Sequence, residues 1–141
     1  FSYKIRTEDL VFIDDYAHHP TEIDALYQAV TEMYPQKDKL IVFQPHLFSR
    51  TKDFGNEFAK SLSRFDEIIL LDIYPAREEP IEGISSEWLL EKIENKNKKI
   101  VLKKDLPLEM KVSNCNVKLM VGAGDIGVEV ESVIKYLRDE N

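Results

Sequence analysis

Short apolar runs separated by polar segments recur along the chain and predict six strands, at residues 1–5, 10–15, 39–44, 67–74, 99–102 and 117–121. Between them, apolar residues three or four positions apart predict helices that begin near Pro20, Phe54, Ser85 and Val130. Residues 105–112 are expected to form a single helical turn. Residues 45–51 and 75–83 are expected to be polar loops.

This alternation of strands and helices predicts an α/β fold. We expect three layers, with a mostly parallel, Rossmann-like sheet of about six strands and helices on both of its faces. A polar turn at residues 6–9 joins the first two strands, so the first strand should run antiparallel to the second. The 141 residues contain no internal repeat or linker, and a single domain is expected.

Four polar segments follow the predicted strands, at residues 15–19, 44–50, 72–79 and 122–125. The carboxyl ends of parallel strands lie at one edge of a sheet, where ligands bind in open α/β folds. All three histidines fall in the first two segments. This clustering predicts a functional site at that edge.

Two charged residues in these segments have both a functional and a structural interpretation. Asp15 ends a buried strand, where an aspartate can accept hydrogen bonds from ribose hydroxyls; the alternative is an ordinary turn carboxylate. Arg50, in a predicted loop, can hold a carboxylate or phosphate with two hydrogen bonds. The alternative is a surface arginine paired with Asp53 or Glu57.

The histidines also leave alternatives open. His18 and His19, together with His46 and the two aspartates Asp14 and Asp15, could ligate zinc or manganese. Their spacing matches no established ligand pattern, so no metal site is expected. Of the pair His18 and His19, one could instead pack at the helix start while the other faces solvent. Residues 122–127 read GAGDIG, but no strand follows them, so we expect a tight turn and close helix packing rather than a dinucleotide site.

Composition narrows the function classes. The net charge of −7 provides no basic field for nucleic acid or an anionic membrane surface. The single cysteine excludes a disulfide framework within the chain and favours a reducing cytosol. No apolar run approaches the 18 residues of a membrane span. The chain opens without a methionine, and we expect it to be a fragment of a longer protein.

Four motifs, in this order, resemble the carboxyl-terminal domain of the ATP-dependent Mur ligases of bacterial peptidoglycan synthesis: DDYAHHPTEI (14–23), FQPHLFSRT (43–51), DIYPAREEPIEGI (72–84) and GAGDIG (122–127). The double histidine resembles the alanine-adding members. The family has three domains: one for the UDP-sugar, a central ATPase domain with a P-loop and Mg²⁺ sites, and a third that closes over both. The resemblance implies that residues 1–141 are the third domain alone.

The resemblance also implies roles for individual residues in a cytoplasmic bacterial ligase. Asp15 would bind the ribose of ATP, and Tyr16 would lie beside the nucleotide. His18 and Arg50 would act at the reacting groups and bind L-alanine, Arg50 through the alanine carboxylate, while His46 would line the same pocket. The other substrate would be UDP-N-acetylmuramate, activated as an acyl phosphate, with Mg²⁺ held mainly by the central domain.

One position departs from the family pattern. Some members have arginine where this chain has Leu47, so the alanine assignment rests on the double histidine. Without the other two domains, the fragment is expected to be inactive. Two other functions remain open: a non-catalytic nucleotide or amino-acid binding module, and a small metal-dependent hydrolase that uses the three histidines.

Overall fold

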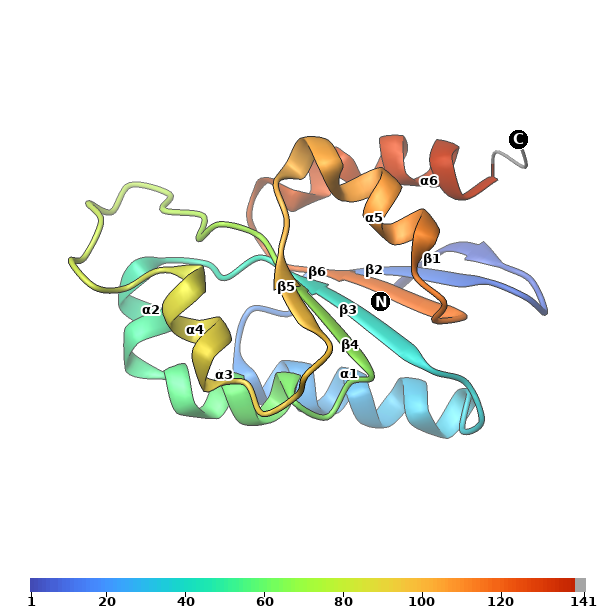
Figure 1. Ribbon diagram of the computed structural model, residues 1–141, viewed down its shortest axis with the longest axis horizontal. Coiled ribbons are helices and arrows are strands. Elements are labelled where there is room, and N and C mark those ends of the chain that lie inside the picture. The colour runs from blue at the N-terminus through green and yellow to red at the C-terminus, as the bar shows by residue number, and fades with distance from the viewer. Residues whose placement is uncertain (139–141) are drawn as a thin grey trace.

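A six-stranded sheet runs through the centre of the computed structural model, which describes residues 1–138 (Figure 1). The order across the sheet is β1-β2-β6-β3-β4-β5. The strands are β1 (Ser2–Arg6), β2 (Val11–Asp15), β3 (Lys39–Phe43), β4 (Glu67–Leu70), β5 (Lys98–Ile100) and β6 (Val117–Val121). β1 is antiparallel to β2, and the other four neighbouring pairs are parallel. The predicted three-layer α/β fold is confirmed.

Helices cover both faces of this sheet. One face carries α1 (Pro20–Met33), α3 (Gly55–Leu62) and α4 (Ser86–Lys92), and the other carries α5 (Leu106–Val112) and α6 (Val130–Arg138) (Figure 1). The short helix α2 (Phe48–Asp53) lies just beyond the end of β3. Two 3₁₀ turns, η1 (Lys103–Asp105) and η2 (Asp125–Glu129), lead into α5 and α6.

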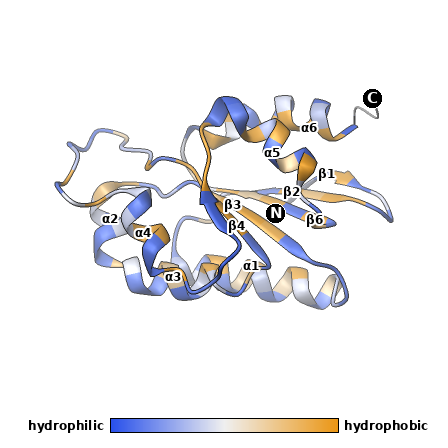
Figure 2. Ribbon diagram, in the orientation of Figure 1, coloured by the Kyte–Doolittle hydropathy of each residue, from blue (hydrophilic) through white to orange (hydrophobic). Residues whose placement is uncertain are grey.

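The apolar core lies on both sides of the sheet because successive strand residues point to opposite faces. In β3, Ile41 and Phe43 belong to the core beneath α1, α3 and α4, whereas Leu40 and Val42 belong to the core beneath α5 and α6. Figure 2 shows this arrangement as largely hydrophobic central strands between helices that are striped with hydrophobic and hydrophilic residues. Burial on both faces explains why the central strands read as continuous apolar runs.

Two helix starts follow the predicted local chemistry. Pro20 occupies the first turn of α1, where a missing N–H leaves no hydrogen bond unmade. The Ser85 hydroxyl accepts a hydrogen bond from the Trp88 amide at 3.1 Å and so caps α4. Pro20 and Ser85 thus mark where α1 and α4 begin.

The predicted strand at residues 67–74 is too long. β4 ends at Leu70. Beyond it, the Leu71 amide still donates to the Phe43 carbonyl, and Tyr74 forms an isolated bridge with His46 in the segment after β3. Pro45 follows β3 and has no N–H to continue the ladder. The apolar run therefore continues past the strand into the loop that extends from the sheet on the left of Figure 1.

Two helical segments also differ from the expectation. Residues 48–53, expected to lie in a loop, form α2, so Arg50 is on a helix. Residues 105–112, expected to be a single turn, form the end of η1 and the seven-residue helix α5, whose Leu106 and Met110 are fully buried. Packing against the rest of the fold stabilises both segments, and neither has the long apolar period that sequence reading depends on.

Candidate functional site

The four polar segments meet at one edge of the sheet, as predicted, because β2, β6, β3 and β4 are adjacent. Backbone hydrogen bonds join neighbouring segments there. The Gly122 amide donates to the Asp15 carbonyl at 3.0 Å, and the Gln44 amide donates to the Val121 carbonyl at 3.0 Å. The Leu47 amide donates to the Tyr74 carbonyl at 2.8 Å. The edge is therefore a continuous, hydrogen-bonded surface.

Three of the predicted site residues lie together on this surface. The ring centroids of His18 and His46 are 6.0 Å apart, and the His46 ring lies 5.3 Å from that of Tyr74. The guanidinium Nη1 of Arg50 donates to the His46 carbonyl at 3.3 Å. We call His18, His46 and Arg50 the histidine–arginine cluster.

Arg50 has unused hydrogen-bonding capacity. A guanidinium has five N–H donors, and in residues 1–138 it makes the single hydrogen bond to His46 described above. It forms no ion pair with Asp53, Glu57 or any other described carboxylate, so the structural alternative weighed from the sequence does not apply. The side chain is partly buried at the start of α2. Its other N–H donors are therefore free, within the described residues, to bind an anion.

The environment of His46 favours a neutral imidazole. Burial is the main cause of its lowered pKa, and the positive charge of Arg50 and the neighbouring His18 lower it further. The Nδ1 atom of His46 is buried without a hydrogen-bond partner in the described structure. A neutral ring can accept a hydrogen bond from an amine, which an imidazolium cannot.

His18 is oriented by its own loop and by α1. Its Nδ1 lies 3.0 Å from the Tyr16 carbonyl, which can only accept, so Nδ1 carries a proton and a neutral ring would leave Nε2 as an acceptor. The backbone amide of His18 donates to the Glu22 carboxylate at 2.9 Å. The Nε2 side of the ring is therefore the one available to a ligand.

His19 has a different environment. It precedes α1, its ring lies 4.6 Å from that of Phe54, and its Nδ1 is buried without a partner in the described structure. The histidine that packs at the helix start is thus His19. His18 instead lines a surface pocket, which is described next. Residues 1–138 contain no group of three or more His, Cys, Asp or Glu side chains arranged to hold a metal ion.

A pocket of about 430 Å³ lies beside the cluster and is lined by Asp15, Tyr16, His18 and Glu22, among others. One Asp15 oxygen accepts from the Ala17 amide at 2.9 Å. The other lies 2.5 Å from the Phe1 ammonium group, a contact that exists only where the chain begins at Phe1. The Tyr16 side chain is 79% exposed.

These features fit a nucleoside. Each Asp15 oxygen has one partner, the Ala17 amide or the Phe1 ammonium group, and keeps a second lone pair that a ribose hydroxyl could use. The exposed Tyr16 ring offers a face for stacking. Asp14, the neighbouring carboxylate, is partly buried in β2, and burial raises its pKa. Asp15, and not Asp14, is the aspartate that accepts from the Ala17 amide and lines the pocket.

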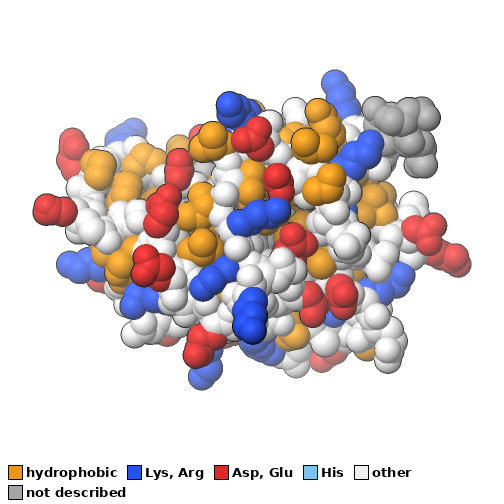
Figure 3. All heavy atoms as spheres, viewed as in Figure 1, with side chains coloured by type: hydrophobic (Ala, Val, Ile, Leu, Met, Phe, Trp, Pro, Cys, Tyr) orange, Lys and Arg blue, Asp and Glu red, His pale blue; other side chains and the backbone are white. Residues whose placement is uncertain are grey.

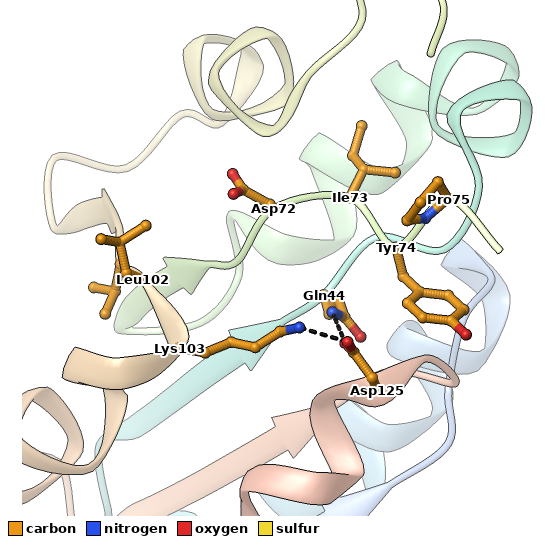
Figure 4. A pocket seen from close by; sticks show the side chains of 9 residues that line it. Gln44, Asp72, Ile73, Tyr74, Pro75, Leu102, Lys103 and Asp125 are labelled. Carbon is orange, nitrogen blue, oxygen red and sulfur yellow. Dashed lines mark hydrogen bonds and ion pairs between the residues drawn. The ribbon is translucent and has the colours of Figure 1, made fainter. Parts of the chain in front are cut away.

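A second pocket of about 240 Å³ is also lined by Tyr74, and three of its polar side chains, Gln44, Lys103 and Asp125, bind one another (Figure 4). The Gln44 amide nitrogen and the Lys103 ammonium donate to separate Asp125 oxygens, at 2.7 and 2.6 Å. Burial would raise the pKa of Asp125, but these hydrogen bonds outweigh it and lower the pKa. The group is internally satisfied, and sequence reading missed it because Lys103 lies outside every polar segment.

Two of the three glycines of GAGDIG, Gly122 and Gly124, serve close packing as predicted, whereas a Cβ atom on Gly127 would meet no atom within 4 Å. A Cβ atom on Gly124 would lie 2.5 Å from the Tyr74 ring and 2.6 Å from the Gln44 side-chain oxygen. Glycine at this position lets η2 approach the end of β3 and the loop after β4. The motif thus packs against Gln44 and Tyr74, which belong to the polar segments at this edge of the sheet.

The face of the molecule in Figure 3 carries mixed charges. Acidic and basic side chains are interspersed with apolar ones on the face in Figure 3, in keeping with a net charge of −7. Among residues 1–138, no helix combines the length and apolar character needed to cross a bilayer.

Comparison with known proteins identifies the family. Residues 3–125 match the model of the Mur ligase, glutamate ligase domain. The chain is 64% identical to a UDP-N-acetylmuramate–L-alanine ligase of Christiangramia forsetii, over 99% of this chain and 31% of that protein. It is 51% identical to the protein of that name from Porphyromonas gingivalis, over 98% of this chain and 30% of the other. The chain thus spans about a third of the length of these relatives.

Solved structures agree with this assignment. The crystal structure of UDP-N-acetylmuramate-alanine ligase from Thermotoga maritima has a TM-score of 0.76 at 27% identity, over 96% of this chain and 29% of that one. A murein peptide ligase from Psychrobacter arcticus has a TM-score of 0.75 at 14% identity and supports the fold alone. The chain therefore belongs to the Mur ligase family and matches the carboxyl-terminal domain of UDP-N-acetylmuramate–L-alanine ligases.

Proposed function

We propose that this chain is the domain that closes over the reactants in an ATP-dependent UDP-N-acetylmuramate–L-alanine ligase. The observation that carries the proposal is the convergence of His18, His46 and Arg50, from two separate loops and a helix, on one edge of the sheet. The relatives named as this ligase support the choice of substrates. The activity requires the two-thirds of those relatives that this chain does not span.

The proposed reaction has two steps. A carboxylate oxygen of UDP-N-acetylmuramate attacks the γ-phosphorus of ATP, which forms an acyl phosphate and releases ADP. The amine of L-alanine then attacks the acyl carbon, the bond to phosphate breaks, and the nitrogen loses a proton to give the amide. Such a sequence depends on holding an amine, an acyl phosphate and developing negative charge in one fixed geometry.

The histidine–arginine cluster is proposed to hold the amino acid. The free donors of Arg50 would bind the alanine carboxylate through two parallel hydrogen bonds. The Nε2 atom of His18 would accept a hydrogen bond from the amine. The neutral His46 would lie next to His18 without adding a second positive charge beside the amine. The amine and the carboxylate of one small substrate would thus meet different groups.

Asp15 and Tyr16 are proposed to bind the nucleoside of ATP, through the ribose and the exposed aromatic ring. Mg²⁺, which would neutralise phosphate charge, is assigned to the rest of the full-length ligase. The chain alone is therefore expected to hydrolyse no ATP and to form no amide.

The test uses a joined protein, in which residues 1–141 replace the matching third of the Christiangramia forsetii relative. We expect phosphate release that depends on L-alanine and UDP-N-acetylmuramate, and none from the 141-residue chain alone. His18→Ala and Arg50→Ala should reduce it at least about 100-fold, because each removes a group that orients the substrate. Lys52→Ala, an exposed position on the same helix as Arg50, is the matched control. Normal rates in both site variants would refute the proposal.

A further inference from the structure

The start of α2, the helix that carries Arg50, is stabilised from outside the helix. Its preceding residue, Leu47, has a φ angle of 75°, a left-handed conformation that is unfavourable for a branched side chain. No side chain at that position caps the helix. Six residues without an apolar period do not form a stable helix on their own. The segment therefore needs an external contact to keep its shape.

Glu78 makes that contact from the loop after β4. One of its carboxylate oxygens accepts a hydrogen bond from the Ser49 amide at 3.1 Å, and the other accepts from the Ser49 hydroxyl. Sequence reading placed this residue in an exposed charged loop. In the structure its carboxylate does the work of a helix cap across 29 residues of chain.

The loop that carries Glu78 is itself held to the edge of the sheet. The Tyr74 amide donates to the Pro45 carbonyl at 2.8 Å, and the Tyr74 carbonyl accepts from the Leu47 amide at 2.8 Å. The Glu78 amide closes a turn by donating to the Pro75 carbonyl at 2.9 Å. The carboxylate thus reaches Ser49 from a fixed point.

Ser49 directly precedes Arg50, so this contact bears on the direction of the guanidinium. Arg50 has one hydrogen bond within residues 1–138, to the His46 carbonyl, and its position otherwise depends on α2. The hydrogen bonds from Ser49 are the main cause of a lowered pKa for Glu78, and the charge of Arg50 contributes. Glu78 therefore remains a carboxylate at neutral pH.

We propose that Glu78 is a positioning residue. It holds the first turn of α2 in place, so that Arg50 faces His18 and His46. Glu78 itself touches no substrate in this account. The contacts of Glu78 stand on their own, and only the identity of the ligand that Arg50 holds rests on the proposed function.

The test compares Glu78→Ala with Glu79→Ala in the joined protein, because Glu79 is the neighbouring exposed carboxylate and has no side-chain hydrogen bond or ion pair within the described residues. Glu78→Ala should raise the KM for L-alanine about tenfold, with kcat changed less than about threefold, since loss of charge-assisted hydrogen bonds mispositions a binding group. Glu78→Gln keeps one acceptor oxygen and should give an intermediate KM. Glu79→Ala should match the parent.

Amide hydrogen exchange, followed by mass spectrometry, supplies a readout that does not depend on catalysis. Peptides covering residues 46–53 should exchange at least about fivefold faster in Glu78→Ala, while peptides from α1 keep the parental rate. Unchanged exchange at residues 46–53, or faster exchange with an unchanged KM, would overturn the proposal. If the parent releases no L-alanine-dependent phosphate, the proposed function fails, and the exchange rates alone decide whether Glu78 braces α2.

Discussion

At the scale of single residues, charge and burial set the roles in the histidine–arginine cluster. His46 is the most telling case, because burial and the positive charge of Arg50 act on its pKa in the same direction. The sequence shows a histidine and an arginine four positions apart, but that spacing alone predicts neither the burial of the ring nor the bond from Arg50 to its carbonyl. Such information depends on packing, which no residue carries by itself.

We predict that His46 titrates below the ordinary histidine value of about 6.5 in an NMR pH titration. A histidine whose pKa is lowered by folding contributes stability that is complete above that ordinary value and is lost as the pH falls toward the lowered one. Arg50→Gln should raise the midpoint part of the way, because burial remains. Lys52→Gln should leave it unchanged. An equal midpoint in the parent and Arg50→Gln would contradict the proposed coupling.

At the scale of elements, the strands and the long helices follow from local pattern, and the short segments do not. The start of α1 at Pro20 and the cap of α4 at Ser85 can be predicted from the sequence, because each has a local chemical signal. The α2 segment has no such signal, since its brace, Glu78, comes from a distant loop. β4 ends early for the related reason that its neighbour runs into Pro45.

The glycine motif offers a matched pair of substitutions at this scale. Gly124→Ala should destabilise the fold by about 1–3 kcal/mol, because the new Cβ would press on the Tyr74 ring and force the edge to shift. Gly127→Ala should be neutral within about 0.5 kcal/mol, since a Cβ there meets no atom within 4 Å. Urea unfolding of both variants measures the difference. Equal stabilities would show that the close approach at Gly124 has no energetic weight.

At the scale of the whole molecule, topology determines where the site lies. Parallel pairing of β2, β6, β3 and β4 brings four loops to one edge, and this was predictable because each loop follows an apolar strand. The strand order itself, with β6 between β2 and β3, was not predictable from local pattern. Because β6 lies between β2 and β3, the GAGDIG segment that follows it packs against Gln44 and Tyr74.

The polar groups along this edge differ in how far the described chain satisfies them. Arg50 and Asp15 have hydrogen-bonding capacity left over, while the polar groups around Asp125 satisfy one another. The chain also spans only about a third of its curated relatives. The proposed closing role accounts for the free groups of Arg50 and Asp15, because such a domain would bring them to reactants held by the rest of the ligase.

The most direct measurement compares L-alanine with L-alaninamide, which lacks the carboxylate, as substrates of the joined protein. If Arg50 holds that carboxylate, the parent should favour L-alanine in kcat/KM, and Arg50→Ala should reduce the preference about 100-fold, because it removes a charge-assisted pair of hydrogen bonds. Lys52→Ala should keep the parental preference. A preference in Arg50→Ala equal to that of the parent would contradict the account, whatever the effect on overall rate.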